Sequence, residues 1–174
     1  MIKYEALHKK EEVNLLNNLI GQRLTSIFGS SITKKDGLTS YHSYATVFLR
    51  NYEQKEILAF TCRLLETPND EEYWKISVQK QKKPPPITYE ADYEGNPVSP
   101  TKTEIPIETS VKKVSIFSKE LQTRHELLIY DHAVVFALEN EKTLCISAIL
   151  SPCGVDISLD DGEIKKILGG CSRR

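Results

Sequence analysis

The chain has 174 residues, which suits one domain, and folding at this length buries roughly 70% of the unfolded surface, so neither disulfides nor a structural metal is required for stability. Charged residues make up 27% and hydrophobic residues 40%, a balance that excludes a disordered chain, a collagen-like repeat and a membrane-embedded body. The 23 Lys and Arg residues against 24 Asp and Glu residues give a net charge of −1, which argues against nucleic acid as a partner.

Hydrophobic periodicity changes several times along the chain, and each change marks a new element. Helical spacing comes first, at Val13, Leu16 and Ile20, with Gly21 in the position of a helix stop. In chain order we expect a helix at 11–20, strands at 23–28, 41–50, 56–65 and 73–78, a strand at 111–117, a short strand or extended segment at 126–131, strands at 133–138, 143–150 and 155–159, and a terminal helix at 160–168. In the strand at 73–78, Trp74 is expected to be a core side chain beside Ile76 and Val78.

These elements predict an α+β fold with a mainly antiparallel sheet, because consecutive strands are joined by hairpin-length connections. The strands at 41–65 and at 133–138 are largely apolar on both faces, whereas a sheet with one solvated face alternates apolar and polar residues. Two short helices cannot cover both faces of such a sheet. In a strongly curled sheet, an open barrel or two packed sheets, strands cover each other's apolar faces, so few helices are needed. We expect a strongly curled sheet or open barrel of about eight strands with an N-terminal and a short C-terminal helix.

A proline-rich insertion or long loop is expected at about 80–110, within a single domain of residues 1–174. Loops longer than about 12–15 residues are uncommon in compact domains and are usually functional, disordered or linkers. Tyr89 and Tyr93 lie in this segment without apolar residues alternating around them. Because tyrosine is enriched where proteins meet, we expect these two side chains to contact a partner.

The sequence contains no motif for a common cofactor, metal or nucleophile. The phosphate-binding loops GxxxxGK[ST] and GxGxxG are missing, as are GxSxG and HExxH. Four carboxylates fall within eight residues, but they lack the spacing of a calcium loop, and the first turn of a helix accounts for most of them. These are Asp156, Asp160, Asp161 and Glu163. We therefore expect neither a cofactor nor a metal site.

One polar cluster remains as a candidate active site: His125, Asp131 and His132, with His42 if its strand lies alongside. Neighbouring residues on a strand point to opposite faces, so Asp131 and His132 are not expected to orient each other as a catalytic base and its partner do. A turn in which Asp131 caps backbone amides explains the pair without any function.

The cellular compartment is predicted from the N-terminal residues, the length of the apolar stretches and the spacing of the cysteines. The first ten residues lack the continuous apolar stretch of a secretory signal, and no apolar stretch approaches the roughly 18 residues of a spanning helix. The four cysteines include no CxxC pair and are expected to stay reduced. We therefore predict a cytoplasmic protein with no membrane partner.

The sequence favours a small binding or interaction protein without catalytic activity, which neutralises or escorts a protein partner or associates with itself. The alternative is a small enzyme or ligand-binding barrel that takes a small molecule in a pocket lined by His132, Asp131, His125 and His42. This alternative predicts at least two of those side chains in one pocket, with perturbed pKa values.

Overall fold

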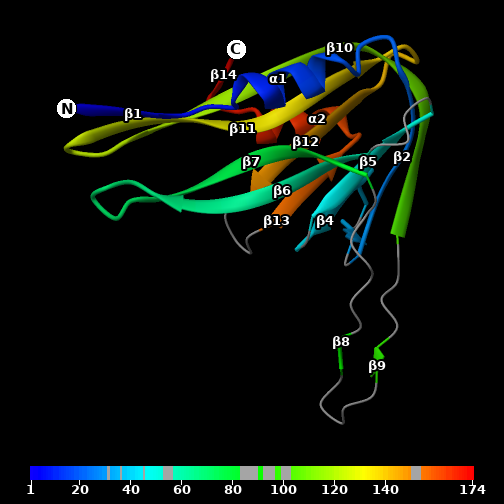
Figure 1. The fold of residues 1–174 in the computed structure, drawn as a ribbon, viewed down its shortest axis with the longest axis horizontal. Coiled ribbons are helices and arrows are strands. Elements are labelled where there is room, and N and C mark those ends of the chain that lie inside the picture. Colours follow the sequence, from blue (N-terminus) through cyan, green and yellow to red (C-terminus); the bar gives the residue numbers. More distant parts are fainter. Residues whose placement is uncertain are drawn as a thin grey trace.

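A computed structural model of the chain describes residues 1–30, 32–35, 37–44, 46–52, 57–82, 90–91, 97–98, 103–149 and 154–174. Most of this part is antiparallel sheet, accompanied by two short helices, α1 (Lys10–Asn17) and α2 (Asp161–Ile167) (Figure 1). The predicted mainly antiparallel sheet with two short helices is confirmed, and the fold is mainly β rather than an even mixture of helix and strand. Neither helix of this described part has the length and apolar character to cross a membrane.

One sheet of 12 strands contains most of the chain, and its longest strand, β10 (Thr103–Gln122), joins two parts of it. The hydrogen-bonded order is β3 (Ile32–Lys34), β4 (Ser40–Ser43), β13 (Gly154–Ser158), β12 (Thr143–Ile149), β11 (Glu126–Leu138), β10, β2 (Arg23–Gly29), β5 (Val47–Asn51), β6 (Ile57–Glu66) and β7 (Glu72–Gln81). Beside this path, β1 (Ile2–Ala6) pairs in parallel with β11, and β14 (Cys171–Arg173) pairs with β10. A separate two-stranded sheet consists of β8 (Glu90–Ala91) and β9 (Pro97–Val98).

The two parts of the sheet face each other and enclose the main core. The first half of β10 pairs with β2, and its second half pairs with β11. Irregular pairing near Pro106 and Val111 marks the change of partner, and such bulges bend a strand. Strands β6 and β7 contact β11 and β12 across the core, as Figure 1 shows. There the rings of Phe60 and Phe136, both fully buried, meet at 6.3 Å with an interplanar angle of 81°.

The prediction of a strongly curled sheet or open barrel of about eight strands is not supported. Within the described residues the outermost strands, β3 and β7, do not pair with each other, so the sheet is not closed. The strand predicted at 41–50 divides into β4 and β5, which lie in different parts of the sheet. Two of the additional strands are β1, whose residues alternate apolar and charged but were not predicted as a strand, and β14, which has only three residues.

The predicted hairpin and N-terminal helix are present, whereas the predicted 80–110 insertion is described only in part. The hairpin predicted at 133–138 and 143–150 is confirmed as β11 and β12, and the N-terminal helix is present with Leu16 fully buried. The end of the predicted 80–110 insertion belongs to β10, which begins at Thr103. Most of the remainder of that insertion lies outside the described residues.

The terminal helix α2 is placed by its cap and by one apolar side chain. Asp160 accepts a hydrogen bond from the backbone N–H of Glu163 at 2.8 Å, which satisfies a free donor of the first turn. Ile164 packs on Ala133 and Cys145, on the face of β11 and β12 opposite the main core. The side chains of Lys166 and Ile167 consequently lie beside the end of β12.

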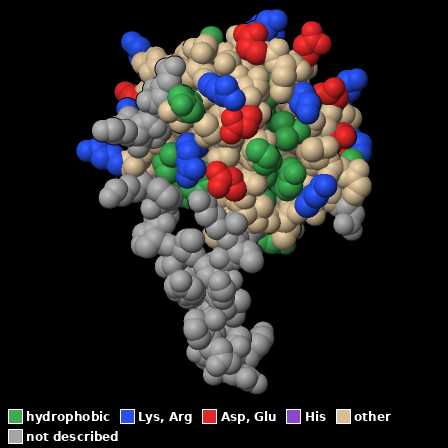
Figure 2. All heavy atoms as spheres, turned by 90° about the vertical axis from the view of Figure 1, so that its right-hand side faces the viewer, with side chains coloured by type: hydrophobic (Ala, Val, Ile, Leu, Met, Phe, Trp, Pro, Cys, Tyr) green, Lys and Arg blue, Asp and Glu red, His purple; other side chains and the backbone are tan. Residues whose placement is uncertain are grey.

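The face of the molecule that carries β2 and β5 shows mixed charges. In Figure 2 the Lys and Arg side chains alternate with Asp and Glu side chains, and hydrophobic side chains lie between them. Nucleic-acid binding draws its affinity from basic groups gathered along the phosphate backbone. The described residues of this face do not form such a one-sign surface.

Candidate binding site at a fork in the sheet

Strands β11 and β12 pair along only part of their length, which opens a fork in the sheet. Their last pair is Ala133 with Ser147. Beyond this pair, β11 continues between β1 and β10, whereas β12 continues beside β13. Beyond the pair Ala133 and Ser147 the two backbones are therefore no longer joined by pairing.

A bulge on β11 lies at the start of the fork. Ala133 pairs with Phe117 of β10, but the next residue of β10, Ser118, pairs with Asp131. His132 is therefore the extra residue of a β-bulge. Bulges redirect side chains and end regular pairing, and they are frequent beside functional sites.

A pocket of about 300 Å³ occupies this region, and we call it the fork pocket. Its walls come from both layers of the fold and from α2. It is lined by Trp74 of β7, Lys119 of β10, Tyr130 and His132 of β11, Ser147, Ala148 and Ile149 of β12, Asp156 of β13, and Lys166 and Ile167 of α2.

His132 is a buried polar side chain in the wall of the fork pocket. It is only 9% exposed, and its ring meets the ring of Tyr130 edge to face at 6.3 Å. No residue of the described chain forms a hydrogen bond with its imidazole. Burial lowers the pKa of His132 to about 4, with a further contribution from the charge of Lys119, while Asp156 opposes the change. The imidazole is therefore neutral at pH 7 and offers one donor and one acceptor.

The buried imidazole gives the protein a pH-dependent stability. Between pH 6.5 and about 4 the unfolded chain binds a proton at His132 and the folded chain does not, so stability falls as the pH falls through this range. His132→Gln is expected to remove about 3 kcal/mol of this decline. Urea denaturation at several pH values measures it, with the exposed His125→Gln as control. Parallel profiles for wild type and His132→Gln would contradict the assignment.

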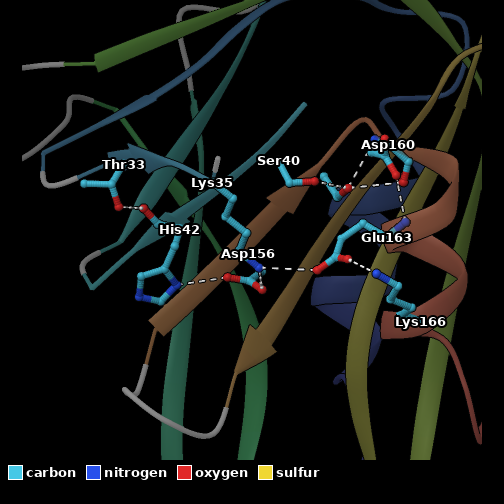
Figure 3. Close-up of polar contacts among 9 residues, drawn as sticks. Thr33, Lys35, Ser40, His42, Asp156, Asp160, Glu163 and Lys166 are labelled. Carbon is cyan, nitrogen blue, oxygen red and sulfur yellow. Dashed lines mark hydrogen bonds and ion pairs between the residues drawn. The ribbon is translucent and has the colours of Figure 1, made fainter. Parts of the chain in front are cut away.

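Asp156 borders the fork pocket, and its carboxylate contacts two partners, Lys35 and His42 (Figure 3). His42 Nδ1 lies 2.9 Å from one carboxylate oxygen, and Lys35 Nζ donates to the other at 2.6 Å. The chain of charges continues from Lys35 to Glu163 at 3.6 Å and from Glu163 to Lys166 at 3.3 Å. The carboxylate of Asp156 is thereby held in place and its negative charge is offset.

His42 fits behind Asp156 because residue 154 is a glycine. A Cβ atom at Gly154 would lie 2.5 Å from the carbonyl oxygen of Ser43 and 2.6 Å from His42 Cε1. The imidazole also contacts the ring of Tyr44, with centroids 4.5 Å apart and an interplanar angle of 87°. An added methyl group at residue 154 would therefore disturb a ring that already packs against a neighbour.

Gly154→Ala is expected to lower the free energy of unfolding by about 1 to 3 kcal/mol, because the backbone of β4 and the His42 ring must shift. Denaturant unfolding followed by circular dichroism measures the change. Gly162→Ala, on the exposed first turn of α2, is the matched control, where the nearest atom belongs to the movable side chain of Asp160. An equal effect of both substitutions would show that His42 and β4 are not packed as described.

A second buried polar cluster centres on Asp131 and is separate from the fork pocket. One carboxylate oxygen accepts the hydroxyl of Ser118 at 2.8 Å, and the other accepts the backbone N–H of His8 at 2.5 Å and a hydrogen bond from Arg174. The ring of His8 lies against the same carboxylate, with Nδ1 3.0 Å from its oxygen. Although burial alone raises its pKa, the hydrogen bonds from His8 and Ser118 lower the pKa of Asp131 to about 2. This carboxylate ties both ends of the chain to β10 and β11.

The four histidine and aspartate residues predicted from the sequence thus occupy different places. His132 lines the fork pocket, and His42 lies behind Asp156 at its border. Asp131 belongs to the cluster around His8, and His125 is exposed at the turn between β10 and β11. The other two predicted contact residues, Tyr89 and Tyr93, lie outside the described residues.

Sequence reasoning missed most of the fork pocket. Trp74 packs against the main core, as predicted, and also lines the pocket, where its indole Nε1 has no hydrogen-bond partner in the described chain. Asp156 had one signal, since it alternates with Val155 and Ile157 and so points away from the core. Lys119 and Tyr130 had none, because only the pairing of distant strands places them here.

The chemistry available in the fork pocket suits binding. Aromatic rings form its walls, a neutral imidazole and lysines supply polar contacts, and the hydroxyl of Ser147 forms no hydrogen bond with His132. A nucleophile and base in contact are therefore not found among its described lining residues. Nor do three His, Cys, Asp or Glu side chains gather as a metal site anywhere in the described ranges.

We compared the chain with protein families, curated proteins and solved structures, and none of them matches it.

Proposed function

We propose that the chain is a binding protein without catalytic activity, which holds a small ligand in the fork pocket. The observation that carries this proposal is His132, an imidazole nine-tenths buried and without a hydrogen bond from the described chain, in the wall of a pocket of about 300 Å³. The imidazole nitrogens of His132 have no partner in the described chain, so a ligand in the fork pocket can form a hydrogen bond with them. Cavities of about 150 Å³ already hold a benzene ring, so this one has room for a ring with a substituent.

The state of the acidic and basic groups favours binding over catalysis. A general base works best with a pKa near the working pH, and a pKa of about 4 makes His132 a weak base at pH 7. Asp156 is held by Lys35 and His42, and Asp131 is held by Ser118 and the residues at both ends of the chain. Neither carboxylate is free to take a proton from a substrate.

The chain provides its own reporter for a test, because Trp74 is its one tryptophan. In a ¹⁵N-labelled sample the single indole N–H signal reports on the fork pocket. Adding aromatic probes of different charge, at concentrations up to the millimolar range, is expected to shift this signal to saturation. Backbone signals of Leu138 and Thr143, which line a separate surface depression, are the internal control. If no probe of any charge shifts the indole signal, the proposal is wrong.

A protein partner is the second candidate, and exposed tyrosines favour it. Tyr44 and Tyr52 are 60% and 77% exposed, and tyrosine often carries binding energy in protein interfaces. The double substitution Tyr44→Ser and Tyr52→Ser is expected to abolish capture of a partner that the wild-type chain retains, or to reduce a dimer to a monomer in sedimentation. Unchanged capture and unchanged mass would contradict the involvement of these side chains.

A further inference from the structure

The charges around the fork pocket do not cancel. Three charged residues line it, and two of them have counter-charges: Asp156 with Lys35 at 2.6 Å, and Lys166 with Glu163 at 3.3 Å. Lys119 is partly buried and forms no salt bridge within the part of the chain that the structure describes. The fork pocket thus carries one uncompensated positive charge.

The ammonium group of Lys119 acts at the same place as the imidazole of His132. Both side chains line the fork pocket, and Lys119 of β10 pairs with Tyr130, two residues before His132 on β11. At neutral pH a cation and a neutral hydrogen-bonding ring are therefore presented together. A carboxylate is the natural complement, since it pairs with an ammonium group and accepts a hydrogen bond from an imidazole N–H.

The remaining walls favour a flat apolar group. Trp74 and Tyr130 present aromatic rings, and Ala148, Ile149 and Ile167 present aliphatic surface. The ring of Tyr130 contacts the rings of Tyr73 and His132, with centroids 5.6 Å and 6.3 Å away. Aromatic rings packed at an edge or offset against such walls gain energy beyond the area they bury.

We propose that the ligand of the fork pocket is a carboxylate that carries an aromatic ring, whose charged group pairs with Lys119 and His132 and whose ring packs against Trp74 and Tyr130. This inference rests on the proposed binding function and adds the chemical class of the ligand. The volume of about 300 Å³ suits one ring with a short acidic side chain.

Three probes of the same shape and different charge test this class: phenylacetate, phenylacetamide and phenethylamine. Dissociation constants are obtained from the Trp74 indole signal at pH 7. Phenylacetate is expected to bind at least about fivefold more tightly than phenylacetamide, because charge-assisted hydrogen bonds are about twice as strong as neutral ones. Phenethylamine is expected to bind most weakly, since Lys119 repels it. Acetate alone should leave the signal unchanged at the same concentrations.

The variant Lys119→Met keeps the length of the side chain and removes its charge. In this variant the preference for phenylacetate over phenylacetamide is expected to fall to about one, while phenylacetamide binding stays unchanged. Lys142→Met, at an exposed lysine outside the fork pocket, should keep the wild-type preference. The dispersion of the amide spectrum verifies that both variants are folded.

The outcomes separate this inference from the proposed function. Equal affinity for the three probes, or tightest binding of phenethylamine, overturns the carboxylate class and leaves binding in the fork pocket intact. A shift with acetate as large as that with phenylacetate overturns the aromatic part. A preference for phenylacetate that survives Lys119→Met overturns the role of Lys119. No shift with any probe overturns both the inference and the proposed function.

Discussion

Replacing Asp131 with asparagine is expected to lower the free energy of unfolding by about 3 to 5 kcal/mol, the usual cost of removing one partner from a buried ion pair. The carboxylate is fully buried and accepts hydrogen bonds from His8, Ser118 and Arg174. An amide has one acceptor oxygen and an NH₂ group, so one of these donors would face another donor. The ring of His8 is itself fully buried and cannot turn to water for a replacement.

Urea unfolding of Asp131→Asn at pH 7 measures this loss. The matched control is Asp70→Asn, at an exposed position where the backbone φ of 62° suits asparagine as well as aspartate. The wild type should also lose about 2 kcal/mol as the pH falls from 3.8 to about 2, because the unfolded carboxylate binds its proton before the folded one does. If both substitutions cost the same, Asp131 does not hold the ends of the chain.

Replacing Phe136 with alanine is expected to lower the free energy of unfolding by about 3 to 5 kcal/mol, the range for large-to-small substitutions of buried aromatic residues. Phe136 of β11 is fully buried and meets Phe60 of β6 across the two facing layers of the sheet. The substitution removes contacts from both layers at once and leaves a cavity between them. Tyr52→Ala is the control, since that side chain is 77% exposed and its loss should cost little.

A double-mutant cycle tests the contact between the layers directly. The single variants Phe60→Leu and Phe136→Leu and their combination are unfolded in urea under the same conditions. Edge-to-face aromatic pairs contribute about 0.5 to 1.5 kcal/mol beyond their buried area, so a coupling of that size is expected. A coupling near zero would contradict the packing of β6 on β11.

Local patterns were sufficient to predict part of the fold. The hairpin of β11 and β12 is visible in two apolar runs around a polar turn, and α1 is visible in the spacing of Val13 and Leu16. The break after Ser43 was not predictable, because residues 41–50 are largely apolar on both faces, like one continuous buried strand. Pairing between β10 and β2, or between β13 and β4, joins residues far apart in sequence, and no local signal encodes it.

The candidate site depends on the same long-range pairing. His132 was predicted as a polar residue of interest, but its place in a bulge follows from its position between the partners of Phe117 and Ser118 on another strand. The pair of His42 with Asp156 joins residues more than a hundred positions apart. The alternation around Trp74 predicted a core side chain, and this prediction is confirmed. The same side chain also lines the fork pocket, which the alternation could not indicate.

Contacts between a bound probe and the protein test the central claim, which is binding at the fork between β11 and β12. Intermolecular nuclear Overhauser effects between the ring protons of phenylacetate and the ¹⁵N,¹³C-labelled chain locate the probe directly. We expect contacts to the indole of Trp74, the ring of Tyr130 and the imidazole of His132, which come from two layers and meet only in the fork pocket. Contacts confined to the depression around Lys112 and Lys142, or none at all, would contradict the account.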